Sequence, residues 1–272
     1  MGEWDTISKS HGTPVTADSI AADLSLIGVK SGMVLLVHSS LSSLGWVSGG
    51  PVAVVLALEQ VLGPEGTLVM PTFSSDLSDP ARWKEPPVPQ GWWETIRETM
   101  PAYDPDLTPT RDVGAIPECF RKQRGTVRSS HPESSFSARG AKAEAITSAH
   151  GLAFSLGEES PMARLYEHDA WILMLGTDFT CNSSLHLSEY RAKYPSKHVI
   201  RCGAPMLKDG KRAWVEFDDL EVNNLDFGLI GAAFIKETGL ARLGHVANAE
   251  TLLIPQRALV DFGVKWIEKN RG

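Results

Sequence analysis

Met33-Val34-Leu35-Leu36-Val37 is a run of five apolar residues, and it begins the segment that most clearly indicates the fold. Such a run is typical of a strand buried on both faces, as the strands of parallel sheets are. A loop rich in Ser and Gly follows over 39–50, then a helix over 51–62 and a second apolar strand over 67–70. A strand, a helix and a strand within about forty residues predict a parallel βαβ unit with a right-handed crossover.

Further predicted elements extend this unit toward both ends of the chain. A helix is expected over 16–27, because Thr16 is suited to cap its first turn and Gly28 to end it. The fold class that we predict is α/β, with a mixed, largely parallel central sheet flanked by helices in a single domain over 1–272. Periodicity and apolar runs place the other helices over 113–122, 141–149, 184–192, 226–238 and 256–269, and the other strands over 170–175, 199–202 and 212–217.

The segment 73–110 differs from the rest of the chain in composition. It contains seven prolines together with Trp83, Trp92, Trp93 and Tyr103. A long irregular segment in a compact domain is commonly a functional lid, and the aromatic side chains favour one that packs. We therefore expect a Pro- and Trp-rich lid insertion that selects among substrates.

The composition restricts the possible partners. The chain has 272 residues, of which 42% are hydrophobic and 22% charged, and its formal net charge is −7. No basic cluster suited to nucleic acid is evident, and no apolar run approaches the roughly 20 residues of a membrane span. With three scattered cysteines and no signal peptide, the protein is expected to be cytoplasmic and to bind neither nucleic acid nor membrane. Its acidic balance suits a cationic ligand.

The loop that follows the first predicted strand is one candidate site. It spans 38–50, carries several hydroxyl side chains and the adjacent Gly49 and Gly50, and leads into a helix N-terminus. Unpaired backbone N–H groups and the helix dipole favour phosphate at such a position. The loop matches neither a Walker motif nor Gly-x-Gly-x-x-Gly, so a phosphate site and an ordinary capped turn remain alternative interpretations.

A second candidate site follows the predicted strand over 170–175. His186 and Glu189 lie three residues apart, so on a helix they share a face. Ligands of open α/β sheets bind beyond the carboxyl ends of strands, and a histidine there is suited to act as a general base near neutral pH. The alternative is a histidine near a helix end with a surface Glu.

Two polar segments are open to several interpretations. The turn over 128–136 is suited to bind a diphosphate or a pantetheine amide, or is an ordinary turn. The segment 216–221 carries four carboxylates in six residues after a predicted strand. These carboxylates either orient a catalytic histidine, bind substrate ammonium groups, or are solvated at the surface.

A cysteine nucleophile and a metal site are the remaining chemical alternatives. Cys181 lies five residues from His186, a separation that fixes no useful geometry for a Cys/His pair. His38, His131 and His168 are possible metal ligands together with His186. The sequence contains no His-Glu-x-x-His or Cys-x-x-Cys spacing, so we expect no metal.

Several separated motifs, taken together and in order, resemble the aminoglycoside 3-N-acetyltransferase family, whose fold differs from that of the GNAT acetyltransferases. The resemblance runs from about residue 16 to the last predicted helix. The matching motifs are Val37-His38-Ser39-Ser40-Leu41, Gly45-Trp46-Val47, Gly49-Gly50, Ala57-Leu58, Leu62 to Thr72, Asp104-Pro105, Thr108-Pro109-Thr110, Arg128-Ser129-Ser130-His131-Pro132, Gly157 to Pro161 and Leu185-His186-Leu187-Ser188-Glu189.

The resemblance implies direct transfer of an acetyl group from acetyl-coenzyme A to the 3-amino group of the 2-deoxystreptamine ring of an aminoglycoside. It implies that His186 is the general base and that Asp219, or next Glu221, orients its ring. Backbone N–H groups near Ser39 and Ser40 would then stabilise the oxyanion. The positions that resemble coenzyme A ligands are His38, Ser39, Ser40, Leu41, Ser42, Gly114 and Ser129.

The acidic residues near the expected cleft are our candidates for holding a polycationic substrate, in a monomer or a homodimer. They are Asp76, Asp104, Asp178 and Glu189. Three other functions remain open. They are an acyltransferase of the same fold that acts on another amine, a metal-dependent hydrolase, and a coenzyme A-binding module without catalysis.

Overall fold

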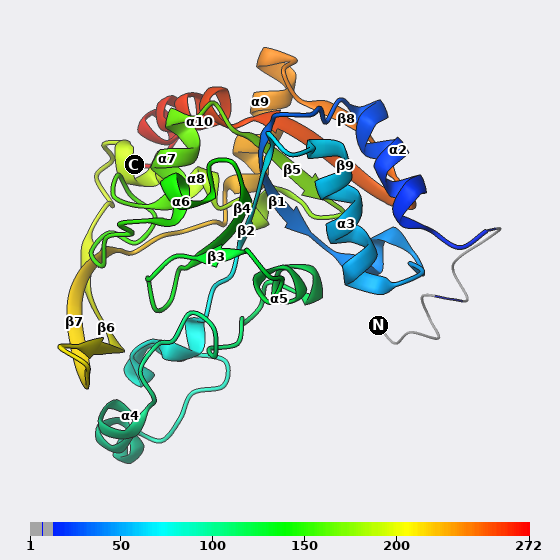
Figure 1. Cartoon of the computed structure of the whole chain (residues 1–272). Coiled ribbons are helices and arrows are strands. Elements are labelled where there is room, and N and C mark those ends of the chain that lie inside the picture. Colours follow the sequence, from blue (N-terminus) through cyan, green and yellow to red (C-terminus); the bar gives the residue numbers. More distant parts are fainter. Residues whose placement is uncertain (1–6, 8–12) are drawn as a thin grey trace.

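The computed structural model describes residue 7 and residues 13–272, and its centre is a seven-stranded sheet (Figure 1). The strands are ordered β3-β4-β2-β1-β5-β9-β8. The adjacent strands β2, β1 and β5 are parallel, and the outer pairs are antiparallel, so only β4 and β9 run against the other five. The predicted mixed, largely parallel sheet is confirmed. Its strands are β1 (Val34–Ser39), β2 (Thr67–Pro71), β3 (Val127–Arg128), β4 (Phe136–Gly140), β5 (Trp171–Leu175), β8 (Arg242–Val246) and β9 (Ala249–Pro255).

The unit predicted from the first apolar run is present. β1 continues through the 3-10 turn η1 (Leu41–Leu44) into α3 (Gly50–Leu62), which leads back to β2 in parallel with β1. The helix predicted before it is α2 (Ala17–Ile27), whose Thr16 cap accepts a hydrogen bond from the backbone N–H of Ser19. Gly28 ends α2 in the left-handed conformation, with φ of 103°.

Alternate residues of each central strand enter two different cores, because helices cover both faces of the sheet. On β1, Val34 and Leu36 pack on one side, and Leu35 and Val37 on the other. Burial on both faces is why the strand is apolar at every one of these positions. One face is covered by α2, α3 and α5 (Ala115–Arg121), and the other by α6 (Ala143–Thr147), α7 (Pro161–Glu167), α8 (Ser184–Arg191), α9 (Phe227–Thr238) and α10 (Gln256–Asn270).

A two-stranded sheet projects from the main body (Figure 1). It consists of β6 (Val199–Lys208) and β7 (Lys211–Leu220), both longer than predicted. Asp209 and Gly210 connect them with positive φ angles of 52° and 74°. A two-residue turn of this kind matches the right-handed twist of a hairpin.

The segment 73–110 forms short 3-10 turns and the helix α4 (Trp93–Thr99), which lies beside this hairpin (Figure 1). The backbone N–H of Tyr103 donates to the carbonyl of Pro205 at 2.9 Å. The Nε of Arg212 on β7 donates to the carbonyl of Met100 at 3.0 Å. The segment is therefore anchored on the hairpin, and its use as a lid remains a proposal.

Candidate active site

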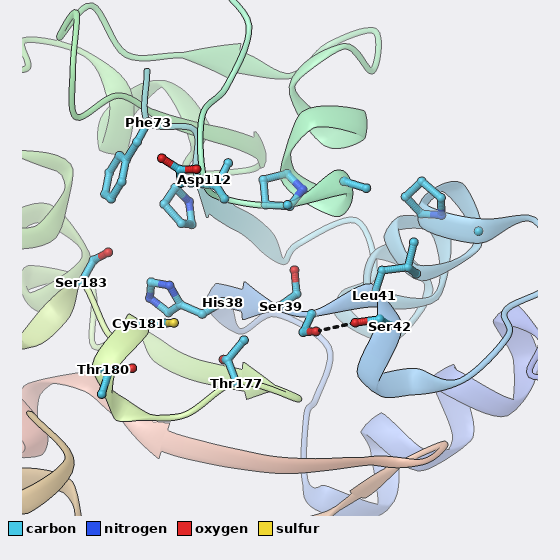
Figure 2. A pocket seen from close by; sticks show the side chains of 18 of the residues that line it. His38, Ser39, Leu41, Ser42, Phe73, Asp112, Thr177, Thr180, Cys181 and Ser183 are labelled. Atoms are coloured by element: carbon cyan, nitrogen blue, oxygen red, sulfur yellow. Dashed lines mark hydrogen bonds between the residues drawn. The ribbon is translucent and has the colours of Figure 1, made fainter. Parts of the chain in front are cut away.

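A cavity of about 870 Å³ lies at the carboxyl ends of β1, β2 and β5, where ligands of open α/β sheets bind (Figure 2). Figure 2 shows His38 and Cys181 across the cavity from Phe73 and Asp112. The loop after β1 forms one wall, and the segment after β5 forms another. Among its lining residues are His38, Ser39, Ser40, Leu41, Ser42, Phe73, Asp112, Gly114, Thr177, Cys181, Ser183, His186 and Asn224.

The two walls meet at a glycine. Gly176 has φ of 68°, and a Cβ at this position would lie 2.5 Å from the Cβ of Ser43. The Ser43 hydroxyl donates to the Gly176 carbonyl at 3.1 Å and so joins the β1 and β5 loops. Only glycine combines this backbone conformation with so close an approach.

Six of the seven expected coenzyme A ligands line the cavity, and Ser129 does not. The carbonyl of Ser155 only accepts, so the neutral His150 ring carries its proton on Nε2 and accepts from Ser129 at Nδ1, 2.9 Å away. The Ser129 oxygen also accepts from the backbone N–H of Phe136 at 2.9 Å. Ser129 thus holds the interior together, and the cavity lining does not support its assignment to coenzyme A.

We expect replacement of Ser129 by alanine to lower the free energy of unfolding by about 1–3 kcal/mol, because two buried polar partners lose their hydrogen bonds. If the cavity binds acetyl-coenzyme A, as the resemblance implies, the KM for this molecule should stay unchanged. Urea denaturation and steady-state kinetics on the same preparation test this. A raised KM with unchanged stability would restore Ser129 to the binding site.

His186 faces the cavity from α8 and is paired with a buried carboxylate. Its Nδ1 lies 2.6 Å from Oε2 of Glu189, and the Glu189 side chain is fully buried. The other oxygen, Oε1, accepts from the backbone N–H of Asn223 at 2.8 Å and from Arg271 at 2.5 Å. Because a carboxylate only accepts, the neutral His186 ring carries its proton on Nδ1, which leaves Nε2 as a base.

The expectation that Asp219 or Glu221 orients His186 is wrong. Oδ1 of Asp219 accepts from Tyr190 Oη and from the backbone N–H groups of Ser155 and Leu220. Glu221 lies 2.7 Å from Nε2 of His198. The segment was expected to follow a strand, but β7 continues to Leu220, so its side chains alternate between the two faces of the hairpin. The partner of His186 is Glu189, which we had expected to bind substrate.

The other three expected substrate carboxylates lie outside the cavity. Asp76 is exposed and lies 3.5 Å from Arg111. Asp104 accepts from the backbone N–H groups of its own turn, and Asp178 caps the 3-10 turn η5 (Phe179–Cys181). The carboxylate that does line the cavity is Asp112, which lies in none of the motifs considered above.

The electrostatics of the cavity centre on His38. Burial, together with the nearby His186, lowers the pKa of His38 to about 3, so this ring is neutral. Among the described residues, Nε2 of His38 and the hydroxyl of Ser39 are buried without a hydrogen-bond partner. Buried polar groups are normally satisfied, so these atoms are available to a bound molecule. The backbone N–H of Ser40 donates to the Leu175 carbonyl at 2.9 Å, so this N–H group is not free to stabilise an oxyanion.

The histidines considered as metal ligands are separated in the structure. Nε2 of His131 contacts the Leu152 carbonyl at 3.1 Å, and Nδ1 of His168 lies 3.4 Å from the Lys142 ammonium. In the part of the chain that the structure describes, no group of three or more His, Cys, Asp and Glu side chains is arranged to hold a metal ion.

Buried titratable groups set the response of the fold to acid. Burial lowers the pKa of His131 to about 4, and burial and the neighbouring His131 lower that of His150 to about 3. In the opposite direction, burial and the nearby Asp219 raise the pKa of Glu133 to about 8. Between pH 6.5 and 4.5 the unfolded chain therefore takes up protons at His38, His131 and His150, and the folded chain keeps one at Glu133.

We expect the free energy of unfolding to fall by about 3 kcal/mol from pH 7.5 to pH 5. Each histidine costs about 2 kcal/mol over this range because its folded form resists protonation, and Glu133 offsets about half of the total. Urea denaturation at the two pH values measures the change. Glu133→Gln removes the offset and should steepen the loss. A stability that is equal or higher at pH 5 would contradict the prediction.

In the described part of the chain, no helix combines the length and apolar character needed to cross a bilayer.

The fold and the site together define an α/β protein with a ligand cavity beside a histidine that is paired with a carboxylate. A family model described as aminoglycoside 3-N-acetyltransferase matches residues 36–268, and the chain belongs to this family. The predicted family and enzyme class, an acyltransferase, are confirmed.

Three comparisons illustrate the relationship. The SPbeta prophage-derived aminoglycoside N(3')-acetyltransferase-like protein YokD of Bacillus subtilis is 46% identical over 97% of this chain and 96% of its own. Aminoglycoside N(3)-acetyltransferase VII of Streptomyces paromomycinus is 35% identical over 100% of this chain and 98% of its own. A solved structure of AAC-IIIb in a binary complex with CoASH has a TM-score of 0.85 and 33% identity, over 96% and 98% of the two chains.

Proposed function

We propose that this chain transfers the acetyl group of acetyl-coenzyme A to the 3-amino group of the 2-deoxystreptamine ring of aminoglycosides. The observation that carries the proposal is the His186–Glu189 pair, which faces a cavity lined by the β1 loop. Relatives that extend over nearly the whole chain are named as aminoglycoside N(3)-acetyltransferases, and one related structure contains CoASH. That the 3-amino group is the one acetylated is inferred from the resemblance to the family.

His186 acts as the general base in the proposed reaction. The amine nitrogen attacks the thioester carbonyl carbon, and its N–H proton passes to Nε2 of His186. Glu189 accepts a hydrogen bond from Nδ1 and stabilises the imidazolium that forms. The C–S bond then breaks, and His186 returns the proton to the sulfur. The products are the N-acetylated aminoglycoside and coenzyme A, with no acyl-enzyme.

The β1 loop and the start of α5 hold acetyl-coenzyme A in this proposal. His38, Ser39 and Gly114 line the cavity, and the first two have buried polar atoms without a protein partner. The hydroxyl of Ser39 replaces the Ser40 N–H as our candidate donor to the thioester oxygen. We infer that the amine approaches past Phe73 and Asp112, which line the cavity where the segment 73–110 begins and just after it ends. This segment would then select among substrates.

The chemical consequence of the reaction is loss of one positive charge. An ammonium group that contacts RNA phosphate becomes a neutral amide, so binding of the aminoglycoside to RNA weakens. This is the physical basis on which the reaction would confer resistance.

The test is an assay with acetyl-coenzyme A and a panel of aminoglycosides that carry or lack a free 3-amino group. Released coenzyme A is followed by its free thiol, and the acetylated position is assigned by NMR. Acetylation only of substrates with a free 3-amino group is the expected result. Acetylation of other amines alone would favour a same-fold acyltransferase with a different substrate, and thiol release from no amine would overturn the proposal.

A further inference from the structure

The carboxylate that orients His186 is itself held by an arginine from a distant part of the chain. Arg271 follows the end of α10, eighty-two residues after Glu189. Its Nη1 atom lies 2.5 Å from Oε1 of Glu189, and its Nη2 atom lies 2.6 Å from Oδ1 of Asp226. The Arg271 side chain is 10% exposed, so both ion pairs are largely removed from water.

The contacts of Arg271 fix its geometry as well as its charge. Its Nε donates to Asp226 at 2.7 Å, and its Nη2 also donates to the carbonyl of Asn223 at 2.7 Å. The guanidinium lies 5.4 Å from the centre of the Tyr194 ring. Burial opposes its charge, but the hydrogen bonds to Asp226 and Glu189 keep the pKa of Arg271 above the ordinary value. The guanidinium is therefore a permanent cation in a fixed orientation.

Glu189 has a different partner on each of its two oxygens. Oε1 is occupied by Arg271 and the Asn223 N–H, so Oε2 remains for Nδ1 of His186. A buried carboxylate without a cationic partner favours its protonated form, which would no longer fix the ring tautomer in the same way. Arg271 places a positive charge beside the Glu189 carboxylate and holds it turned toward the histidine.

We propose that Arg271 is a positioning residue for acetyl transfer, which sets both the orientation and the proton affinity of the His186–Glu189 pair. The inference rests on the proposed role of His186 as general base. Arg271 acts through Glu189 and does not line the cavity. The chain Arg271–Glu189–His186 then links the end of α10 to the reacting amine.

The positive charge of Arg271 opposes the binding of a further proton beside it. His186 and Glu189 share a hydrogen bond, so a proton added to either group changes the electrostatics of both. Arg271 repels that proton, and its removal makes the pair bind it more tightly, whichever of the two groups carries it. Other titratable groups that face the pair or Arg271 are Asp226, Lys197, Tyr194 and His38, and they are unchanged in the variants below.

Two charge-removing variants test the proposal. Arg271→Met keeps the bulk of the side chain, and Arg271→Gln keeps a donor for Glu189. In both, we expect the acid limb of the pH–rate profile to move up by about one pH unit and kcat to fall about tenfold. The KM for acetyl-coenzyme A should be unchanged. Arg271→Lys keeps the positive charge but loses the planar set of N–H donors of the guanidinium group. The acid limb of its pH–rate profile should therefore stay in place while kcat falls severalfold.

A matched control lies on α10 itself. Arg257 pairs with Asp169 at 2.8 Å on an exposed surface, so Arg257→Met removes an ion pair without touching Glu189. Neither its pH profile nor its kcat should change. Thermal melting of every variant separates loss of folded protein from loss of rate.

A second readout needs no turnover and so distinguishes this inference from the proposed function. The titration midpoint of the His186 imidazole, followed by NMR, should move to higher pH in the Met and Gln variants and not in the Lys or Arg257→Met variants. Failure of the wild type to acetylate any aminoglycoside would overturn the proposed function and leave this measurement valid. An unshifted midpoint in both charge-removing variants, a wild-type kcat in Arg271→Lys, or rate losses that follow melting temperature alone would overturn the role of Arg271.

Discussion

Replacing His186 with alanine is expected to lower kcat for aminoglycoside acetylation by about 10²–10⁴-fold, the usual contribution of a general base. The fold should survive, because the ring occupies a cavity wall and is 16% exposed. The affinity for coenzyme A should be retained, since the β1 loop and not His186 is proposed to hold it. Steady-state kinetics and calorimetric titration with coenzyme A measure the two quantities.

A matched control for this variant is His198→Ala. His198 is 60% exposed and pairs with Glu221, the carboxylate first considered as an alternative partner of the His186 ring. Its removal should leave the rate within about twofold, since a pair exposed to solvent contributes little. An unchanged kcat in His186→Ala, or an equal loss in His198→Ala, would remove His186 as the base.

Replacing Glu189 with glutamine is expected to lower kcat by about 10²-fold or more. A carboxylate can only accept the Nδ1 proton, whereas an amide can also donate and so stabilise the other tautomer, in which Nε2 carries the proton and is no base. The KM for acetyl-coenzyme A should change little. The pH dependence of kcat should change as well, because the imidazolium loses its carboxylate partner.

Asp219→Asn is the corresponding test of the corrected assignment. Asp219 holds backbone N–H groups at Ser155 and Leu220, so its loss should lower the melting temperature while the rate of folded enzyme stays within about threefold. Comparison of kcat per folded enzyme in the two variants decides between the carboxylates. A larger loss of rate in Asp219→Asn than in Glu189→Gln would reverse the correction.

The local pattern predicted most of the elements that position the site. Apolar runs identified β1, β2 and β5 because central strands are buried on both faces, and the spacing that placed His186 and Glu189 on one face of a helix is realised in α8. The strands β3, β4, β8 and β9 were not predicted. β3 has only two residues, and β8 is largely exposed, so neither carries a continuous apolar signal.

The expected residues line the cavity where a single segment supplies its wall, and the contacts that the fold assembles from distant segments were missed. The cavity positions in the β1 loop are contiguous in sequence, so a single motif indicated them. The assignment of Asp219 failed because a carboxylate cluster near a predicted strand end says nothing about which face of a hairpin each side chain takes. Asp112 and Arg271 belong to none of the motifs that resemble the family.

The amino-acid sequence by itself determined the α/β class, the family, and the histidine and carboxylate that share a helix face, because these depend on periodicity and short-range spacing. Only the tertiary structure decided which carboxylate meets His186, that Ser129 belongs to the interior, and that Arg271 completes the charge arrangement around Glu189. Such contacts join residues separated by tens of positions. Their energies depend on burial and distance, which arise when the sheet and its two helical layers come together.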